Sequence, residues 1–267
     1  MTELERVAHA AVAEGGALLR SAWRQQKVVH HKGAIDLVTE TDRQLEDLIV
    51  ARLRAAFPDH RIVAEEATGN AAVARAAAGD EVWYLDPLDG TTNFAHGYPQ
   101  ISISLAFARG DEVQLGIVHD PLRDETFSAA LGAGASLNGE SIHVSTTAEL
   151  GDALIATGFP YDRREHLEFY LAFFAAFVRR TQGVRRAGSA ALDLCYVACG
   201  RVDGFFEWKL KPWDTAAGVL IAREAGGIVT DFRGDTFDLH GQQTLAANPA
   251  LHAAVSRVLG ETLDEPR

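Results

Sequence analysis

The stretch WYLDPLDGTTNFAHG, residues 83–97, decides how the rest of the chain is interpreted. An apolar run over residues 82–85 predicts a buried strand, and it leads directly into Asp86 and Asp89 in a Pro/Gly turn. Carboxylates are seldom buried unless they are paired or bind a metal. An Asx turn around Pro87 would explain the pair structurally, whereas a binding site would explain why both acids stand at the mouth of a strand.

Acidic residues stand at the edge of an apolar element in three other places. Asp42 ends DLVTETD where a helix starts, and Asp214 precedes the apolar helix TAAGVLIAREAGG. Glu65 and Glu66 follow the expected strand RIVA. Each place alone has a simpler explanation, because Asp42 and Asp214 suit helix N-caps and the two glutamates suit a solvated loop. If the strand ends and helix starts meet, however, five or six carboxylates share one cleft, and their mutual repulsion requires cations.

The donor atoms of this predicted cleft indicate which metal it would take. All candidates are oxygen ligands with no His or Cys at ligand spacing, which favours Mg²⁺, Mn²⁺ or Ca²⁺ over Zn²⁺. Pro87 and Gly90 would fix the turn so that the Leu88 carbonyl also faces the metal. Residues 90–93, GTTN, predict a short helix whose first N–H groups bind phosphate. Acid-held metals beside a phosphate cradle indicate metal-assisted phosphoryl chemistry.

Composition excludes several other classes of protein. The 267 residues are 47% hydrophobic, enough for a sizeable core, and the formal net charge of −12 disfavours nucleic-acid binding by a basic face. No apolar stretch approaches the ~20 residues of a membrane span, and the N-terminus indicates an amphipathic helix rather than a signal peptide. Cys195 and Cys199 lie four apart in a helical segment and are expected to pack in the core. A reducing cytoplasm fits this cysteine usage.

The order of expected elements indicates an α/β protein with layered sheets and helices. Helices are expected at about residues 2–25 and 42–57, and strands at RIVA and EVWYLD with a short Ala-rich helix between them. Three further strands follow, and Asn138-Gly139 predicts a hairpin. After about residue 150, strands and helices alternate up to a final helix at about 250–259. Antiparallel strands flanked by this alternation argue against a purely parallel doubly wound sheet.

Together these motifs resemble the inositol monophosphatase family of Mg²⁺-dependent, lithium-sensitive phosphatases. The resemblance covers almost the whole chain, in family order, through WYLDPLDGTTNFAHG, DLVTETD, AEE, GSAALDLCYVACGRVDGFFEW and KPWDTAAGVLIAREAGG. It implies a five-layer α-β-α-β-α sandwich, usually a homodimer. It also implies one catalytic unit over residues 1–267 with two packed halves, about 1–150 with the metal and phosphate motifs and about 151–267 with the substrate-hydroxyl residues and the last metal ligand.

The resemblance further implies roles for individual residues. Two or three Mg²⁺ ions, with Mn²⁺ as a substitute, would be held by Glu65, Asp86, the Leu88 carbonyl, Asp89 and Asp214. Asp42, Glu65 and Thr91 would be catalytic, with Asp42 and Thr91 orienting the attacking water. The substrate would contact Leu88, Asp89, Gly90, Thr91, Gly188, Ser189, Ala190, Glu207 and Asp214. Lys32 would lie in the loop before Asp36. Ala64 replaces a glycine frequent in the family, and the choice of Glu65 over Glu66 rests on the resemblance.

The expected reaction is hydrolysis of a small-molecule phosphomonoester, with myo-inositol 1-phosphate preferred because GSAALDL and FFEWKLKPWD resemble inositol-type bacterial members. Fructose 1,6-bisphosphate, 3′-phosphoadenosine nucleotides and histidinol phosphate are the alternatives, and Arg185-Arg186 could supply the basic pocket of a bisphosphate. A phosphoaspartate mechanism is disfavoured because Pro87 occupies the position of the nucleophile. Another alternative is a regulatory binding partner, as some bacterial relatives are.

Overall fold

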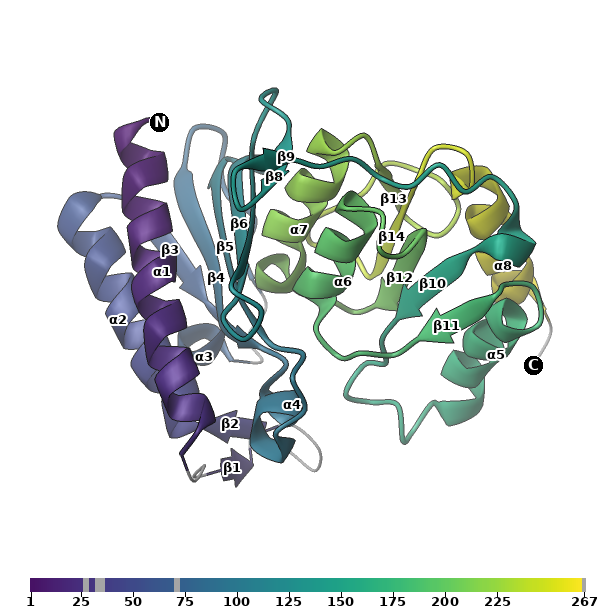
Figure 1. Ribbon diagram of the computed structural model, residues 1–267, viewed down its shortest axis with the longest axis horizontal. Coiled ribbons are helices and arrows are strands. Elements are labelled where there is room, and N and C mark those ends of the chain that lie inside the picture. The colour runs from purple at the N-terminus through teal and green to yellow at the C-terminus, as the bar shows by residue number, and fades with distance from the viewer. Residues whose placement is uncertain (26–28, 32–36, 70–72, 266–267) are drawn as a thin grey trace.

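Helices and sheets alternate through five layers of the computed structural model, which describes residues 1–25, 29–31, 37–69 and 73–265 (Figure 1). Two helices cover the outer face of a seven-stranded sheet, two more lie between it and a five-stranded sheet, and a last pair covers the far face. In that order the pairs are α1 (Glu3–Trp23) with α2 (Glu40–Ala56), α6 (Ala190–Ala198) with α7 (Pro212–Glu224), and α5 (Leu167–Val178) with α8 (His252–Asp264). The expected α-β-α-β-α sandwich is confirmed.

The larger sheet is formed by the first part of the chain. Its strands are neighbours in sequence order and, apart from the parallel pair β3–β4, run antiparallel. They are β3 (Arg61–Ala64), β4 (Glu81–Asp89), β5 (Ser102–Arg109), β6 (Glu112–Asp120), β7 (Glu125–Ala130), β8 (Ala135–Leu137) and β9 (Glu140–Ser141). Asn138 and Gly139 link the last two with φ angles of 51° and 84°, the left-handed pair that a two-residue hairpin requires.

The smaller sheet has the order β11-β10-β12-β14-β13 and mixes parallel and antiparallel pairs. Its strands are β10 (Leu154–Thr157), β11 (Gly183–Arg185), β12 (Gly204–Trp208), β13 (Ile228–Thr230) and β14 (Gln243–Ala247). Around the two sheets lie the short elements β1 (Val29–His31), β2 (Leu37–Thr39), α3 (Glu65–Thr68), α4 (Thr91–His96) and a 3₁₀ turn (Leu150–Asp152). The division of the chain into halves near residue 150 stays a prediction.

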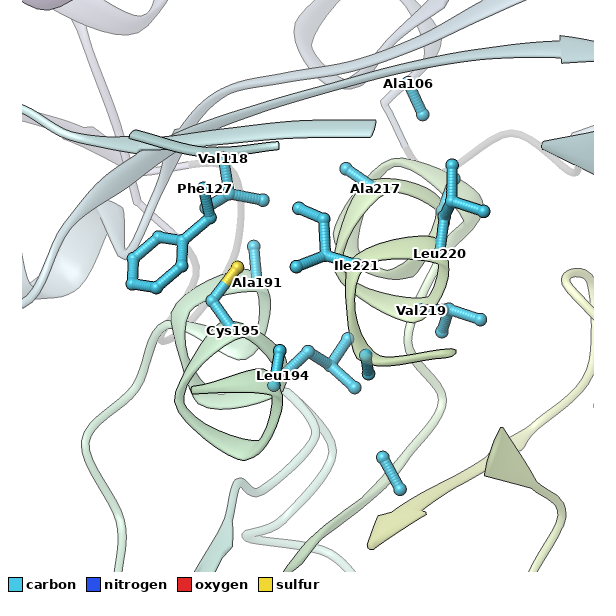
Figure 2. Close-up of a cluster of buried hydrophobic side chains, with 14 of the residues drawn as sticks. Ala106, Val118, Phe127, Ala191, Leu194, Cys195, Ala217, Val219, Leu220 and Ile221 are labelled. Atoms are coloured by element: carbon cyan, nitrogen blue, oxygen red, sulfur yellow. The ribbon is translucent and has the colours of Figure 1, made fainter. Parts of the chain in front are cut away.

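The central helices pack against the larger sheet through small and branched side chains. Figure 2 shows Ala191, Leu194 and Cys195 of α6 close to Ala217 and Ile221 of α7. From the sheet, Ala106, Val118 and Phe127 complete the same buried cluster. Cys195 is therefore a core residue, as predicted, and both cysteines are free thiols. This packing fixes the first turns of α6 and α7 beside the end of β4.

Some element predictions were wrong in detail. The Ala-rich helix expected before EVWYLD is absent from residues 73–77, which have no regular structure, and the helix after β3 is instead the four residues of α3. Strand β14 was not predicted at all. Helix α8 continues to Asp264, beyond the expected end. Among the described residues, no helix combines the length and the apolar character needed to cross a lipid bilayer.

The contact between β6 and α7 is close enough to test by substitution. A Cβ atom added at Gly116 would lie 2.7 Å from the carbonyl oxygen and 2.9 Å from the Cα of Ala217. We expect Gly116→Ala to lower the free energy of unfolding by about 1–3 kcal/mol, because backbone atoms of α7 must move. The measurement is urea denaturation followed by circular dichroism.

Gly260→Ala is the matched control. This glycine lies in α8, and an added Cβ would meet no atom within 4 Å, so stability should stay the same or rise. Equal stability of the Gly116→Ala variant and the wild type would contradict the close contact between sheet and helix.

Candidate functional site

A pocket of about 720 Å³ opens between the end of the larger sheet, the first turns of α4 and α7, and the segment after β10. Residues from six separate parts of the chain line it, although they lie far apart in sequence. They are Arg43, Glu65, Glu66, Gly69, Asp86, Leu88, Asp89, Gly90, Thr91, Thr92, Asn93, Phe159, Pro160, Tyr161, Asp162, Arg163, Arg186, Gly188, Ala190, Glu207, Trp208, Lys209, Leu210, Lys211, Trp213 and Asp214.

Strand β4 carries two of the buried carboxylates through an irregularity in its pairing. Asp86 pairs with Ser104 of β5, and Asp89 pairs with Ser102. Between these two pairs, β4 therefore contains one residue more than β5. In a regular strand, residues three apart point to opposite faces, but the extra residue of a bulge brings them to the same side. Pro87, which has no N–H, is tolerated within this bulge. The acids therefore belong to the strand itself and not, as the sequence suggested, to a turn after it.

Asp89 connects the larger sheet to α6. Its Oδ2 accepts hydrogen bonds from the hydroxyl of Ser189 at 2.6 Å, the amide of Ala191 at 2.9 Å and the hydroxyl of Ser102 at 3.4 Å. Burial raises the pKa of Asp89, although the bonds from Ser189 and from the helix amides lower it. With all three bonds on Oδ2, Oδ1 is left for another ligand.

Asp42 and Thr91 form a second polar pair at the start of α4. Asp42 is 1% exposed, and its Oδ1 accepts the Thr91 hydroxyl at 2.9 Å. Its other oxygen accepts the amide of Thr39 at 2.8 Å and the Thr39 hydroxyl. Thr39 is the N-cap of α2, so Asp42 is the third helical residue of a capping box rather than the cap that the sequence suggested. The Thr91 hydroxyl also lies 3.1 Å from the Leu88 carbonyl oxygen.

Asp214 occupies the equivalent position in α7. It is the third helical residue, and its Oδ2 accepts the amide of Lys211, the N-cap, at 2.7 Å. The hydroxyl of Ser104 on β5 donates to the Trp213 carbonyl at 3.0 Å and so holds this first turn against the sheet. Asp214 is thus positioned by both the helix cap and the sheet.

The carboxylates repel one another strongly enough to change their protonation. Burial raises the pKa of Asp86 well above its usual range, and the charges of Glu65, Asp89 and Asp214 raise it further. Burial and the charge of Glu65 likewise raise the pKa of Asp214. This environment favours protonated acids unless a positive charge is present.

A divalent cation with a preference for oxygen fits this set of donors. Carboxylates and a backbone carbonyl border one pocket, and a cation would remove the repulsion that raises their pKa values. Among the residues that the structure describes, no three His, Cys, Asp or Glu side chains are already close enough together to hold a metal ion. Binding would therefore have to draw the carboxylates closer to one another.

Glu207 lies on the other side of the pocket, at the end of β12. It is buried next to Gly158, where an added Cβ would come within 2.1 Å of its carboxylate, so only glycine leaves room for it. Burial raises the pKa of Glu207 to about 8, against the opposing effect of Arg186. The acid is therefore mostly protonated at neutral pH and can donate as well as accept a hydrogen bond.

The pocket brings together nearly all the residues singled out from the sequence. Asp42 and Ser189 do not line it, since they are buried behind Thr91 and Asp89, to which they are bonded. Lys32 and Asp36 lie outside the described residues. Sequence reasoning missed Arg163 and Asn93, although Asn93 donates to the carbonyls of Gln100, Ala187 and Gly188 and joins the two sides of the pocket. Asn93 lies within the motif over residues 83–97, and nothing else in the sequence marks it as a residue of the site.

Comparison with known proteins identifies relatives over the full length of the chain. The sequence profile described as the inositol monophosphatase family matches residues 1–263. An inositol-1-monophosphatase of Synechocystis sp. is 45% identical over 96% of this chain and 88% of its own. A putative Nus factor SuhB of Neisseria meningitidis serogroup B is 43% identical over 94% and 95%. A Thermotoga maritima protein named fructose-1,6-bisphosphatase/inositol-1-monophosphatase is 41% identical over 94% and 93%.

A solved structure shows the same fold. The inositol monophosphatase of Anabaena (Nostoc) sp. PCC 7120 superposes with a TM-score of 0.85, at 40% identity and with 97% of each chain covered. The layered architecture described above is therefore shared with that protein.

The raised pKa values predict how cation binding depends on pH. Asp86, Asp89 and Asp214 hold protons to higher pH than free aspartates, so a cation must displace those protons at low pH. We expect the rise in melting temperature produced by Mg²⁺ to be small at about pH 5 and to grow towards about pH 8, because stability gained by ligand binding increases with affinity. Differential scanning calorimetry with and without Mg²⁺ measures it.

Asp264→Asn is a suitable control, because this exposed acid is paired with Arg233 far from the pocket and should leave the Mg²⁺ effect unchanged. A Mg²⁺ effect that is independent of pH would mean that the buried acids do not bind the cation.

Proposed function

The chain belongs to the inositol monophosphatase family and is a phosphatase, and we propose that its substrate is myo-inositol 1-phosphate, which it hydrolyses to inositol and inorganic phosphate. The observation that carries the proposal is one pocket with buried carboxylates on one side, the Asp42–Thr91 pair at its base and Glu207 on the other side. Related sugar and polyol phosphates belong to the same proposal.

The cofactor of this proposal is Mg²⁺, as two or three ions, with Mn²⁺ as a substitute. The ligands would be Glu65, Asp86, the Leu88 carbonyl, Asp89 and Asp214. Bound cations would supply Lewis-acid stabilisation of the phosphoryl and leaving-group oxygens. The raised pKa of Asp86, caused by burial and by the neighbouring carboxylates, and the position of the Asp89 hydrogen bonds on Oδ2, which leaves Oδ1 for a ligand, support this assignment. Lithium sensitivity, a homodimer and a cytoplasmic location stay predictions.

Asp42 and Thr91 would prepare the attacking water. Because Thr91 donates its proton to Asp42, its oxygen can accept a hydrogen bond from water and hold it for in-line attack on phosphorus. The proton of the water would pass by way of Thr91 to Asp42 while the bond from phosphorus to the alcohol oxygen breaks. The electron pair of that bond stays on the alcohol oxygen, which takes up a proton from solvent water to give the alcohol. Gly90 and Thr91 line the pocket, and their backbone amides would bind the phosphate. No side chain becomes phosphorylated.

The hydroxyl groups of the substrate would meet the second side of the pocket. Gly188 and Ala190 line it and leave room near α6, while Ser189 is held by Asp89. Glu207, protonated at neutral pH, can bond a substrate hydroxyl in either direction.

A panel of phosphate-release assays tests the reaction. With Mg²⁺, we expect release from inositol 1-phosphate to exceed release from fructose 1,6-bisphosphate, 3′-phosphoadenosine phosphate and histidinol phosphate, and chelation should abolish it. Asp89→Asn should lower kcat by about 100-fold or more and raise the Mg²⁺ requirement, because a carboxylate of the proposed metal site is lost. Asp264→Asn is the control with wild-type kinetics. A preference for another member of the panel would replace the substrate proposed here.

Glu207→Ala separates hydroxyl recognition from phosphate recognition. We expect KM for inositol 1-phosphate to rise by about 10-fold, since a hydrogen bond in a buried site is lost, and KM for p-nitrophenyl phosphate to change much less. Steady-state kinetics with both substrates measure the difference. Equal changes in the two KM values would show that Glu207 does not contact a hydroxyl of the substrate.

The name of the Neisseria relative, putative Nus factor SuhB, favours a second candidate role, as a binding partner in a regulatory assembly. Catalysis and such binding can coexist on one chain. Capture of the same partners by the wild type and by Asp89→Asn would separate the role from turnover, whereas capture of none by either would count against it.

A further inference from the structure

A second cavity lies where α1 covers the outer face of the larger sheet, and we call it the α1 cavity. Its volume is about 550 Å³, and it opens between the second half of α1 and the strands β6 and β7. A volume of this order is large enough for a small molecule. The α1 cavity shares no lining residue with the pocket that holds the buried carboxylates, so it is a separate site.

Small residues of α1 give the α1 cavity its shape. Ala13 and Ala17 line it, and Gly16 lets the ring of His119 lie directly against the helix. A Cβ atom at Gly16 would come within 2.4 Å of His119 Nε2, so only glycine allows this close approach. Nδ1 of the same ring lies 2.9 Å from the hydroxyl of Thr126. The cavity therefore has a well-packed back wall and an apolar part formed by the two alanines.

The open side of the α1 cavity is basic. Arg20 and Arg24 are four residues apart at the end of α1, so they project from the same side of the helix. Arg20 pairs with Asp124 at 2.6 Å, whereas Arg24 forms no ion pair with a described residue. Burial and the charge of Arg20 lower the pKa of His119, so this ring is mostly neutral at pH 7. Among the described residues that line the cavity, Asp124 is the only acid, and two guanidinium groups therefore share one carboxylate.

The ion pair between Arg20 and Asp124 is open to exchange with a ligand. The Asp124 side chain is 78% exposed and that of Arg20 is 46% exposed, and ion pairs in such contact with water contribute little to stability. Arginines also suit the last turn of a helix because they interact favourably with its dipole. The dipole accounts for the two arginines, but it does not account for the hollow between them and the strands.

We propose that the α1 cavity binds a small organic anion, whose phosphate or carboxylate group replaces Asp124 beside Arg20 and also contacts Arg24. Guanidinium groups bind such oxygens through charge-assisted hydrogen bonds. The hydroxyl of Ser21, which also lines the cavity, can donate a further hydrogen bond to the same group. A short hydrocarbon part of the ligand would cover the methyl groups of the two alanines. This binding takes place outside the carboxylate pocket and does not depend on the proposed function.

Three probes with the same hydrocarbon chain test the proposal. Propylphosphonate, butyrate and butyramide each carry three carbons, joined to a phosphonate, a carboxylate and a neutral amide. We expect the two anions to shift the backbone amide NMR signals of residues 20–24 and 124–126 until the site is saturated, and butyramide to leave them in place. The titration of ¹⁵N-labelled protein gives both the position of the site and the Kd, and the two anions show which acidic group is preferred.

Variants of the lining residues give changes of opposite sign. Arg20→Gln and Arg24→Gln should each weaken the binding of the preferred anion by about 10-fold, because a charge-assisted hydrogen bond is lost. Asp124→Asn should tighten binding by up to about 5-fold, because the competing carboxylate is removed. Two controls should keep the wild-type Kd. Arg6→Gln removes an exposed arginine near the start of the same helix, and Arg186→Gln removes one from the carboxylate pocket.

Signals of residues 20–24 and 124–126 that do not shift with either anion would overturn the proposal, and so would equal binding of butyramide. An affinity that both Arg20→Gln and Arg24→Gln leave unchanged would do the same. Weaker binding to Asp124→Asn would contradict the exchange of partners at Arg20. Loss of binding in Arg186→Gln alone would show that the anions occupy the carboxylate pocket instead. None of these measurements requires turnover, so a failure of the proposed function leaves the test intact.

Discussion

The bulge in β4 is the constraint on which the rest of the site depends. Without the extra residue between Asp86 and Asp89, one of these acids would point to the face covered by α1 and α2, into an apolar core. With it, both acids lie on the side of α6 and α7, where hydroxyls and helix amides can meet them. One irregular step in a buried strand therefore places negative charge where the second part of the chain can use it.

The buried acids share one arrangement. One carboxylate oxygen accepts a hydrogen bond from a backbone amide, and the other oxygen is left for the chemistry of the site. Asp42 bonds the Thr39 amide and Thr91, Asp214 bonds the Lys211 amide, and Asp86 bonds the Leu88 amide at 2.9 Å. Helix capping and catalysis looked like competing explanations of Asp42 and Asp214 in the sequence. The structure places both acids at the third helical position beside the pocket, where one oxygen accepts the amide of the N-cap residue, so a structural role for one oxygen leaves a functional role for the other.

Motifs predicted the fold, and they singled out residues that the structure brings to one pocket, whereas local conformation was harder to predict. The stretch around Asp86 combines strand residues with a proline and a glycine, and only the pairing with β5 shows that the strand continues through Pro87. Alanines before β4 favour a helix in isolation, but residues 73–77 are in an irregular segment, an instance of tertiary context overriding propensity. Arg163 carries no motif, because its importance comes only from the segment that places it near Arg186.

The net charge of the chain says little about the pocket, because acidic and basic side chains occupy different sides of it. The chain carries −12 overall, yet the pocket sets buried acids, whose pKa values burial and mutual repulsion raise, beside Arg163 and Arg186, which form no ion pair with a described residue. A phosphate ester approaching the acidic side is repelled by those acids that are ionised until cations are bound, whereas the guanidinium groups of Arg163 and Arg186 attract anions at once. Asp89 couples the two regions, because the oxygen that holds Ser189 at the start of α6 belongs to the same carboxylate that would hold the cation. Cation binding at the sheet and the shape of the substrate side are therefore linked through a single side chain.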